Sequence, residues 1–351
     1  MLSLSKISPN TLLVFFMCFL HTGIFSQQAN CHQIFEFISN HIESNYPGFK
    51  DKIEDSNLEG DQKFKEKILL RLKHKVDEKC IASLQRYIEF FKDEHIQLFK
   101  NNQPVANSSN NIEYDSFEFK SLNKNTSYIK IPSFNQRISR RIDSLMMLYS
   151  KSNPRKPYLI LDLRGNEGGV TFTFEPLLPL LGIEEIHYIG FDVFSTRTNR
   201  KAYMRLMESS YYPESQKPYL KAIIDSMQVS PNQLIPLSPD YIRQFRVDEY
   251  PKSMVILIDT KCGSATEHFL FAAQQSERVT LMGNATRGVY DYGDMREFPI
   301  PNSTFQLWCA TTRSRRLNDG NGIDHVGIQP EIALDNYEDW LKTALNFLKS
   351  K

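Results

Sequence analysis

The chain carries almost no net charge, because 42 Lys and Arg residues oppose 41 Asp and Glu residues and leave a formal charge of +1. Binding to nucleic acid or to an anionic membrane surface usually depends on an excess of basic residues. We therefore expect no nucleic-acid partner. Low-complexity tracts and internal repeats are also absent, so the composition is that of an ordinary globular protein. With 351 residues, the chain can form one large domain or two smaller ones with a sizeable core.

Cysteine is scarce in this sequence. The five cysteines are spaced widely and irregularly, at Cys18, Cys31, Cys80, Cys262 and Cys309. This spacing fits no zinc site, so no metal ion is expected, and no organic cofactor is implied. In an oxidising compartment Cys31 and Cys80 could form a disulfide bond. Two separate buried thiols would explain them equally well.

Only one long apolar run is present, at residues 11–20, and it is too short to span a membrane comfortably. Lys6 precedes this run and small and polar residues follow it, which is the pattern of a secretory signal peptide. We predict a signal peptide over residues 1–26, with cleavage near Ser26. The mature protein is then exported, periplasmic or extracellular, and has no membrane span. An uncleaved N-terminal anchor is the alternative.

The periodicity of apolar residues divides the chain into two parts. Residues 27–100 are predicted to form an N-terminal helical segment, because apolar residues recur at helical spacing in residues 34–42, 63–72 and 81–91. In residues 101–350, strands are predicted at 128–134, 158–163, 254–259 and 279–282, with helices at 138–149 and 264–273. This alternation predicts an α/β fold with a mixed or largely parallel sheet and helices outside it.

Three further expectations concern the second part. Residues 187–250 are rich in Tyr and Pro and break the alternation, so we predict an insertion there that takes part in substrate selection. Residues 174–181 are expected to be helical. Asp335 is expected to cap a final helix that buries Trp340, Leu341, Leu345 and Leu348.

A glycine-rich turn follows one buried strand. The apolar run at 158–163 ends in residues 164–169, which include three glycines. Such a turn can present several backbone N–H groups at one point, where they can stabilise a developing negative charge. A turn whose glycines only satisfy backbone geometry is an equal alternative.

A serine lies at a second junction between a strand and a helix. The buried strand ends at Asp259, and Ser264 begins an apolar helix, which places a hydroxyl beside the positive end of that helix. Locally, a simpler interpretation is favoured, in which Ser264 is an N-cap and Glu267 completes a capping box.

A serine nucleophile would need a base and an orienting group. His95 lies where the helical segment ends, and His268 lies on the same helix as Ser264. His325 has Asp324 beside it as a competing functional group. The residues alone do not select among these three histidines.

Five segments taken together resemble the tail-specific serine proteases. This group includes C-terminal processing proteases, the tricorn core protease and the repeats of the interphotoreceptor retinoid-binding protein. The segments occur in the same order and spacing, at residues 128–134, 162–169, 263–267, 283–288 and 327–332. The resemblance covers roughly residues 80 to 335 and implies a fold of the Clp-protease/crotonase type, a ββα superhelix.

The resemblance also implies roles for residues. The family's Ser-Ala-x-Glu motif makes Ser264 the nucleophile, with the amide of Ala265 and a glycine of Gly168 and Gly169 as oxyanion donors. Processing proteases use a lysine base, but Val289 stands at that position here.

The tricorn-like branch uses a histidine and an acidic residue instead, which correspond to His95 as base and Asp324 as orienting group. That branch usually has Glu at the position of Asp324 and often has Ser at the position of Glu94. Glu94 could therefore compete as the residue that orients His95.

Fewer than thirty residues separate Phe99 from Tyr128, which is too few for the PDZ domain of the processing proteases. The expected function is that of an exported serine peptidase that cleaves peptides or unfolded proteins through an acyl-enzyme. One alternative is a catalytically inactive homologue that binds an apolar ligand or peptide. A crotonase-type acyl-CoA enzyme is a third possibility, which export disfavours. The oligomeric state is not predicted.

Overall fold

The computed structural model describes residues 28–54, 58–105, 117–152, 156–210, 212–335 and 339–351. The predicted signal peptide, residues 1–26, lies outside this part of the chain. Across the described ranges, every helix is too short or too polar to cross a membrane.

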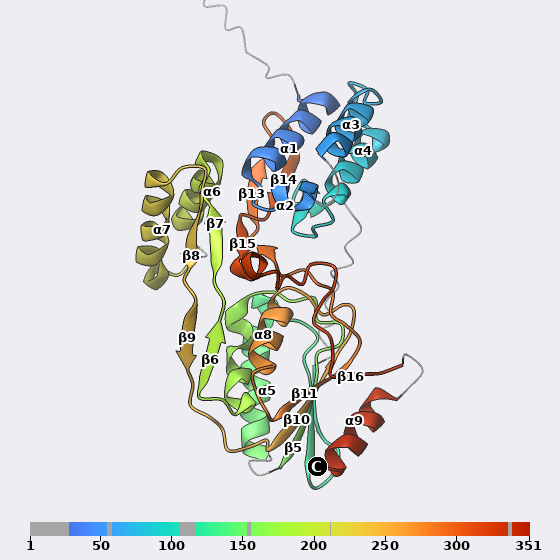
Figure 1. Cartoon of the computed structure of the whole chain (residues 1–351), viewed down its shortest axis with the longest axis vertical. Coiled ribbons are helices and arrows are strands. Elements are labelled where there is room, and N and C mark those ends of the chain that lie inside the picture. Colours follow the sequence, from blue (N-terminus) through green and yellow to red (C-terminus); the bar gives the residue numbers. More distant parts are fainter. Residues whose placement is uncertain (1–27, 55–57, 106–116, 153–155, 211, 336–338) are drawn as a thin grey trace, which may run out of the picture.

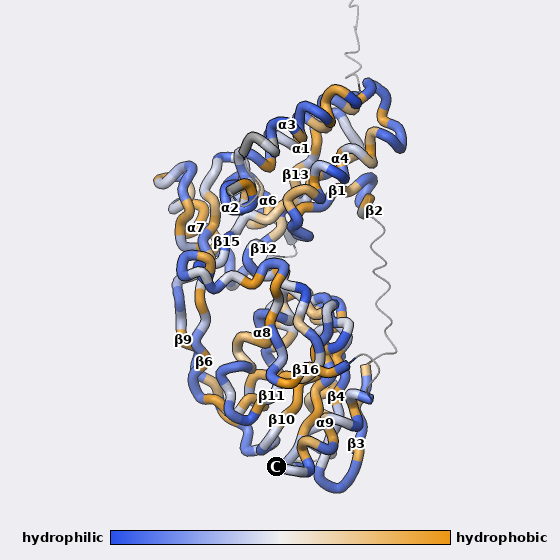
Figure 2. The backbone as a smooth tube through the Cα atoms, turned by 45° about the vertical axis from the view of Figure 1, so that its right-hand side comes forward, coloured by the Kyte–Doolittle hydropathy of each residue, from blue (hydrophilic) through white to orange (hydrophobic). Residues whose placement is uncertain are grey.

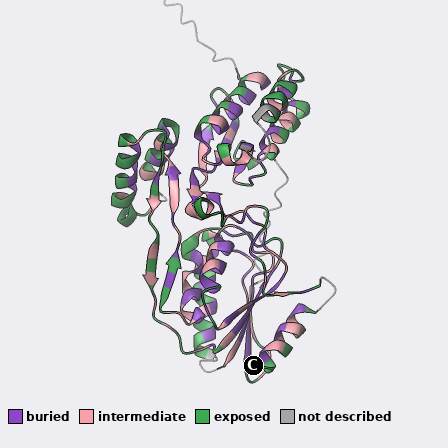
Figure 3. Cartoon of the chain, viewed as in Figure 1, coloured by how far each residue is buried: buried purple, intermediate pink, exposed green. Residues whose placement is uncertain are grey.

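A six-stranded sheet forms the lower half of the molecule in Figure 1, with the strand order β16-β11-β10-β5-β4-β3. Its strands are β3 (Glu118–Ser121), β4 (Thr126–Lys130), β5 (Tyr158–Asp162), β10 (Ser253–Ile258), β11 (Val279–Gly283) and β16 (Ile332–Ala333). All neighbours are parallel except β3 and β4. Helices cover both faces, so β5 and β10 are buried almost throughout, which explains their apolar runs (Figures 2 and 3).

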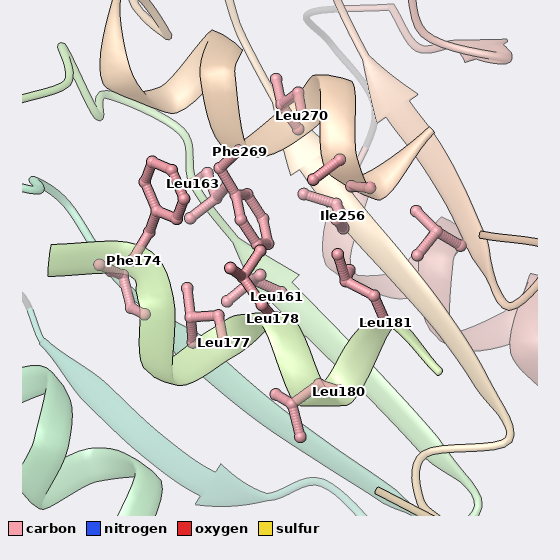
Figure 4. Close-up of a cluster of buried hydrophobic side chains, with 14 of the residues drawn as sticks. Leu161, Leu163, Phe174, Leu177, Leu178, Leu180, Leu181, Ile256, Phe269 and Leu270 are labelled. Carbon is pink, nitrogen blue, oxygen red and sulfur yellow. The ribbon is translucent and has the colours of Figure 1, made fainter. Parts of the chain in front are cut away.

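One face of this sheet is covered by α5 (Ser139–Ser152), α8 (Ala265–Ala273) and the 3₁₀ helix η3 (Thr171–Leu181). Figure 4 shows how Phe174 and Phe269 meet over strand residues such as Leu161. The helix expected over 174–181 is therefore present, but it is 3₁₀ in form. Pro176 and Pro179 lie inside it, and proline cannot donate the backbone hydrogen bonds of an α-helix.

The opposite face of the sheet is covered by α9 (Trp340–Lys349), with Trp340 and Leu348 buried and Leu341 and Leu345 half-buried. The expected cap is wrong by four residues. Asp339 caps this helix by accepting the backbone N–H of Lys342, whereas the carbonyl of Asp335 accepts the indole N–H of Trp340.

The N-terminal helices form a second unit with an antiparallel sheet. Helices α1 (Cys31–Asn45), α2 (Phe49–Glu54), α3 (Leu58–Leu69) and α4 (Glu78–Phe90) lie beside the sheet β13-β14-β1-β2. Its strands are β1 (Ile96–Lys100), β2 (Gln103–Pro104), β13 (Arg296–Pro299) and β14 (Phe305–Cys309). The segment is thus joined to the C-terminal part of the chain by β1–β14 pairing and a shared core. A disulfide bond links Cys31 of α1 to Cys80 of α4, and Cys262 and Cys309 are buried thiols.

Residues 185–244 form an extension on the left of Figure 1. It contains β6 (Glu185–Tyr188), β7 (Phe191–Phe194), α6 (Arg197–Glu208), the short η4 (Glu214–Gln216), α7 (Lys217–Val229), β8 (Leu234–Ser238) and β9 (Tyr241–Gln244). Strand β6 pairs with β9, and β7 lies between β8 and β15 (Thr312–Ser314), which also pairs with β12 (Tyr292–Gly293). The extension has a small core of its own around Tyr203 and Ile224.

Candidate active site

Ser264 lies in a tight turn between β10 and α8. Its backbone has φ 54° and ψ −116°, a conformation that residues with a Cβ rarely adopt. Such strained residues are concentrated at functional sites. Ser264 is the N-cap of α8, and its backbone N–H donates to the Glu267 carboxylate over 2.9 Å, as the sequence predicted.

Glu267 also holds a neighbouring loop. Its buried carboxylate accepts the Thr286 hydroxyl at 2.6 Å and the backbone N–H groups of Gly288 and Val289 at 2.7 and 3.0 Å. Burial raises the pKa of Glu267, and these hydrogen bonds oppose the increase. The sequence indicated only the cap, because a loop twenty residues downstream leaves no local pattern.

The structure brings His95 to Ser264 across 169 positions of sequence. Nε2 of His95 lies 3.5 Å from Oγ of Ser264, which is a long contact of the kind that catalytic groups often show without substrate. His95 immediately precedes β1, and its carbonyl accepts the backbone N–H of Ala310 at 3.0 Å. The pairing of β1 with β14 therefore fixes the position of this histidine.

Asp93 lies on the other side of the imidazole. Its Oδ1 is 3.3 Å from Nδ1 of His95 and accepts the backbone N–H of the same residue at 2.8 Å. Burial alone would lower the pKa of His95, but contact with Asp93 and its negative charge raise that pKa above its ordinary value. Burial would likewise raise the pKa of Asp93, but contacts with His95 and Tyr46 hold it below the usual value.

The structure does not bring Asp324 into the expected contact with His95. The carboxylate of Asp324 instead pairs with Nζ of Lys52 at 2.7 Å. Glu94, the expected competitor of Asp324, pairs with Arg287 at 3.0 Å. The carboxylate that contacts His95 is that of Asp93, which the sequence analysis did not single out. The available signal was the Asp-x-His order, since aspartate commonly accepts the backbone N–H two residues later.

The two other candidate histidines lie in different surroundings. The ring of His268 packs against Phe174, Tyr188 and Tyr290, and burial lowers its pKa to about 4. Nε2 of His325 lies 3.2 Å from Nζ of Lys52, and burial together with that cation lowers its pKa. Within the described residues, no hydrogen bond joins either ring to Ser264.

The glycine-rich turn after β5 lies directly against the serine. A Cβ placed on Gly168 would be 2.5 Å from the carbonyl oxygen of Gly263 and 2.9 Å from the amide nitrogen of Ala265. Gly168 also has φ +98°, so both its space and its backbone conformation require glycine. The turn and the start of α8 therefore enclose one small region.

The two glycines of this turn differ as hydrogen-bond donors. The N–H of Gly168 already donates to Oδ1 of Asn166 at 3.0 Å. The backbone N–H of Phe134 donates to the carbonyl of Gly168, and the carbonyl of Phe134 accepts the N–H of Val170, which forms a parallel bridge. Gly169 lies between these two bonds, so its own N–H points away from Phe134. Ala265 is the first residue of α8, where no intrahelical acceptor exists for the N–H. Among the residues that the structure describes, Gly169 and Ala265 thus remain as available donors beside Ser264.

No cluster of three His, Cys, Asp or Glu side chains suited to a metal ion occurs in the described portion of the chain. The chemistry that this arrangement can perform is acyl transfer, since it combines a hydroxyl, a base with its orienting acid and backbone donors.

Comparisons with known proteins agree with this chemistry. The model of peptidase family S41 matches residues 125–334, more than half of the chain. No curated protein sequence matches.

Several solved structures are similar over most of the chain. A candidate peptidase from Parabacteroides merdae ATCC 43184 is 16% identical, with 92% of this chain and 96% of that chain covered and a TM-score of 0.61. Mature CPAF complexed with lactacystin is 12% identical, with 92% and 97% covered and a TM-score of 0.62. A lipoprotein from Streptococcus agalactiae is 15% identical, with 93% and 99% covered and a TM-score of 0.51.

At these identities the structural matches show a shared fold, which agrees with the Clp-protease/crotonase type expected from the sequence. The family assignment rests on the match that spans the sheet from β4 to β16, the glycine turn and the serine turn. The chain belongs to peptidase family S41 and is a serine-type peptidase.

Proposed function

We propose that this protein is an exported serine peptidase that cleaves peptides or unfolded proteins through an acyl-enzyme. Ser264 is the nucleophile, His95 is the base and Asp93 orients the base. The observation that carries this proposal is the contact of Ser264 Oγ with His95 Nε2, with Asp93 on the opposite ring nitrogen. Neutral imidazole can then accept a proton on Nε2 while Asp93 stabilises the cation that forms.

The reaction follows from these positions. Oγ of Ser264 attacks the carbonyl carbon of the substrate as its proton moves to His95. The N–H groups of Gly169 and Ala265 receive the negative charge that develops on the carbonyl oxygen. Collapse of the tetrahedral intermediate breaks the C–N bond, and the leaving amine takes the proton from His95. A water molecule then hydrolyses the ester by the same sequence of proton transfers.

Export is supported by two independent features. The sequence of residues 1–26 has the pattern of a signal peptide. The Cys31–Cys80 disulfide also fits an oxidising compartment such as the periplasm or the extracellular space, because disulfides rarely persist in the cytosol.

The test is labelling of the mature protein with a fluorophosphonate, followed by peptide mapping of the adduct. Only an activated hydroxyl reacts, so we expect one adduct at Ser264 that the Ser264→Ala variant lacks. The His95→Ala variant should label at a greatly reduced rate. Absence of labelling in the folded protein would favour the catalytically inactive homologue that binds an apolar ligand or peptide.

A further inference from the structure

The hydroxyl of Tyr46 contacts the carboxylate of Asp93, the proposed orienting group of the site. Tyr46 follows α1 as its C-cap, and its Oη donates to Oδ2 of Asp93 at 2.5 Å. The other oxygen of Asp93 faces His95. Four groups therefore follow one another in contact, from Ser264 through His95 and Asp93 to Tyr46.

This contact has the features of a strong hydrogen bond. The acceptor is an ionised carboxylate, and hydrogen bonds to charged acceptors are shorter and stronger than those between neutral groups. Burial and the charge of Asp93 raise the pKa of Tyr46 well above its ordinary value, so the phenol is protonated at neutral pH. Tyr46 therefore donates to Asp93 and stabilises its charged form.

The surroundings of Tyr46 restrict the direction of its hydroxyl. The ring lies 5.4 Å from that of Tyr292 and 6.5 Å from that of Phe91. A Cβ on Gly48 would be 2.4 Å from the Tyr46 hydroxyl, so the chain passes closely beside it. With only 1% of its surface exposed, the side chain has little room to turn away from Asp93.

The same helices that carry Tyr46 also support the base. The disulfide links α1, which is capped by Tyr46, to α4, after which the chain continues to Asp93 and His95. The other titratable or charged groups that face Asp93 and His95 come from α2, β12, β14 and the loops beside them. Those that interact with Asp93 or His95 themselves are Glu94, Cys309, Asp324 and His325. Lys52, Lys92 and Tyr292 act instead on the neighbours of this pair, which are Asp324, His325 and Tyr46.

We propose that Tyr46 is a positioning residue of the hydrolytic site, which holds the Asp93 carboxylate so that its other oxygen, Oδ1, faces the imidazole of His95. This inference rests on the proposed roles of Ser264, His95 and Asp93. It makes the N-terminal helical unit part of the catalytic apparatus, although the nucleophile and the oxyanion donors belong to the six-stranded core.

The test compares Tyr46→Phe with Tyr292→Phe. Tyr292 is a neighbouring buried tyrosine, but its hydroxyl donates to Asp51 at 2.7 Å rather than to Asp93. We expect Tyr46→Phe to lower kcat/KM about tenfold or more, the scale expected for a hydrogen bond to a charged group. Tyr292→Phe should leave kcat/KM within about twofold, since hydrogen bonds away from the reacting groups contribute mainly to stability.

The pH profile separates positioning from a general loss of structure. Without the phenol, the Asp93 carboxylate is more basic and stabilises the imidazolium more, so the pKa of His95 should rise. The acidic limb of kcat/KM should then move to higher pH in Tyr46→Phe and stay in place in Tyr292→Phe. Replacement of Tyr46 by a fluorinated tyrosine, a stronger donor, should move the limb to lower pH.

A titration of His95 by NMR gives the same readout without turnover. If the wild type cleaves no peptide and Ser264 does not label, the proposed function fails, while the pKa of His95 still tests the role of Tyr46. An unchanged pKa of His95 in Tyr46→Phe and in the fluorinated protein would overturn the inference, whatever happens to activity.

Discussion

One oxygen of the Glu267 carboxylate accepts the backbone N–H of Ser264, and the other accepts the hydroxyl of Thr286. The turn that carries Ser264 and the loop over residues 283–288 are therefore held by a single buried side chain. Within the described part of the chain, its carboxylate receives four donors, two on each oxygen. This arrangement suits an ionised acid and does not suit an amide, which has only one accepting atom.

Replacement of Glu267 by Gln should therefore disturb the site although the side chain keeps its size. The amide nitrogen would face two donors, and we expect a loss of about 2–3 kcal/mol in the free energy of unfolding. The rate of fluorophosphonate labelling at Ser264 should fall as well. Chemical denaturation and labelling kinetics measure the two effects. Glu277→Gln, a change at an exposed residue shortly after α8, is the control and should alter neither.

The choice between Asp93 and Asp324 can be made from the pH dependence of kcat/KM. The pKa of His95 is raised, and the base must be neutral, so activity should fall as the pH decreases through a value above about 6.5. Asp93→Asn removes the charge that raises the pKa of His95, so burial lowers that pKa. The acidic limb of kcat/KM should then move to lower pH. The value of kcat should fall by about 10⁴, as for loss of an orienting aspartate in a serine protease.

Asp324→Asn is the matched substitution for this experiment. Asp324 lies further along the same network and also raises the pKa of His95, so a smaller shift in the same direction is expected. Most of kcat should be retained, because the Asp93 contact remains. A large loss in Asp324→Asn together with a small loss in Asp93→Asn would reverse the assignment.

Gly168→Ala should abolish most activity by displacing the turn that we propose holds the oxyanion. The added methyl group would meet the carbonyl of Gly263 and the amide of Ala265, so one of the two donors would be displaced. Loss of an oxyanion donor lowers kcat by about 10² to 10³. Gly165→Ala is a close control, because Gly165 also has positive φ but has open space around its Cβ position. That variant should lose about 1–2 kcal/mol of stability and retain its kcat.

The sequence was sufficient for the local parts of this structure. The apolar runs of β5, β10 and β11 and the turn at Ser264 depend on neighbouring residues, and the structure has them close to the expected positions. The position of His95 beside Ser264 depends instead on the pairing of β1 with β14, which lies more than two hundred residues further along the chain. The charge of Lys52 could not be placed near Asp324 for the same reason, because 272 positions separate them. Long-range pairing of this kind leaves no periodic signal in a single sequence.

The Cys31–Cys80 disulfide offers a test of how far the N-terminal unit supports catalysis. Removing a native disulfide typically costs about 2–5 kcal/mol. Here the bond joins α1 to α4, and these helices hold Tyr46 and the approach to His95. The Cys31→Ser, Cys80→Ser double variant should therefore lose labelling of Ser264 at lower denaturant concentration than it loses most of its far-UV circular dichroism, to which both units contribute. The wild type should show one transition for both signals. Coincident transitions in the variant would mean that the two units unfold together, because the core shared by the helices with β1, β13 and β14 is sufficient to couple them without the disulfide.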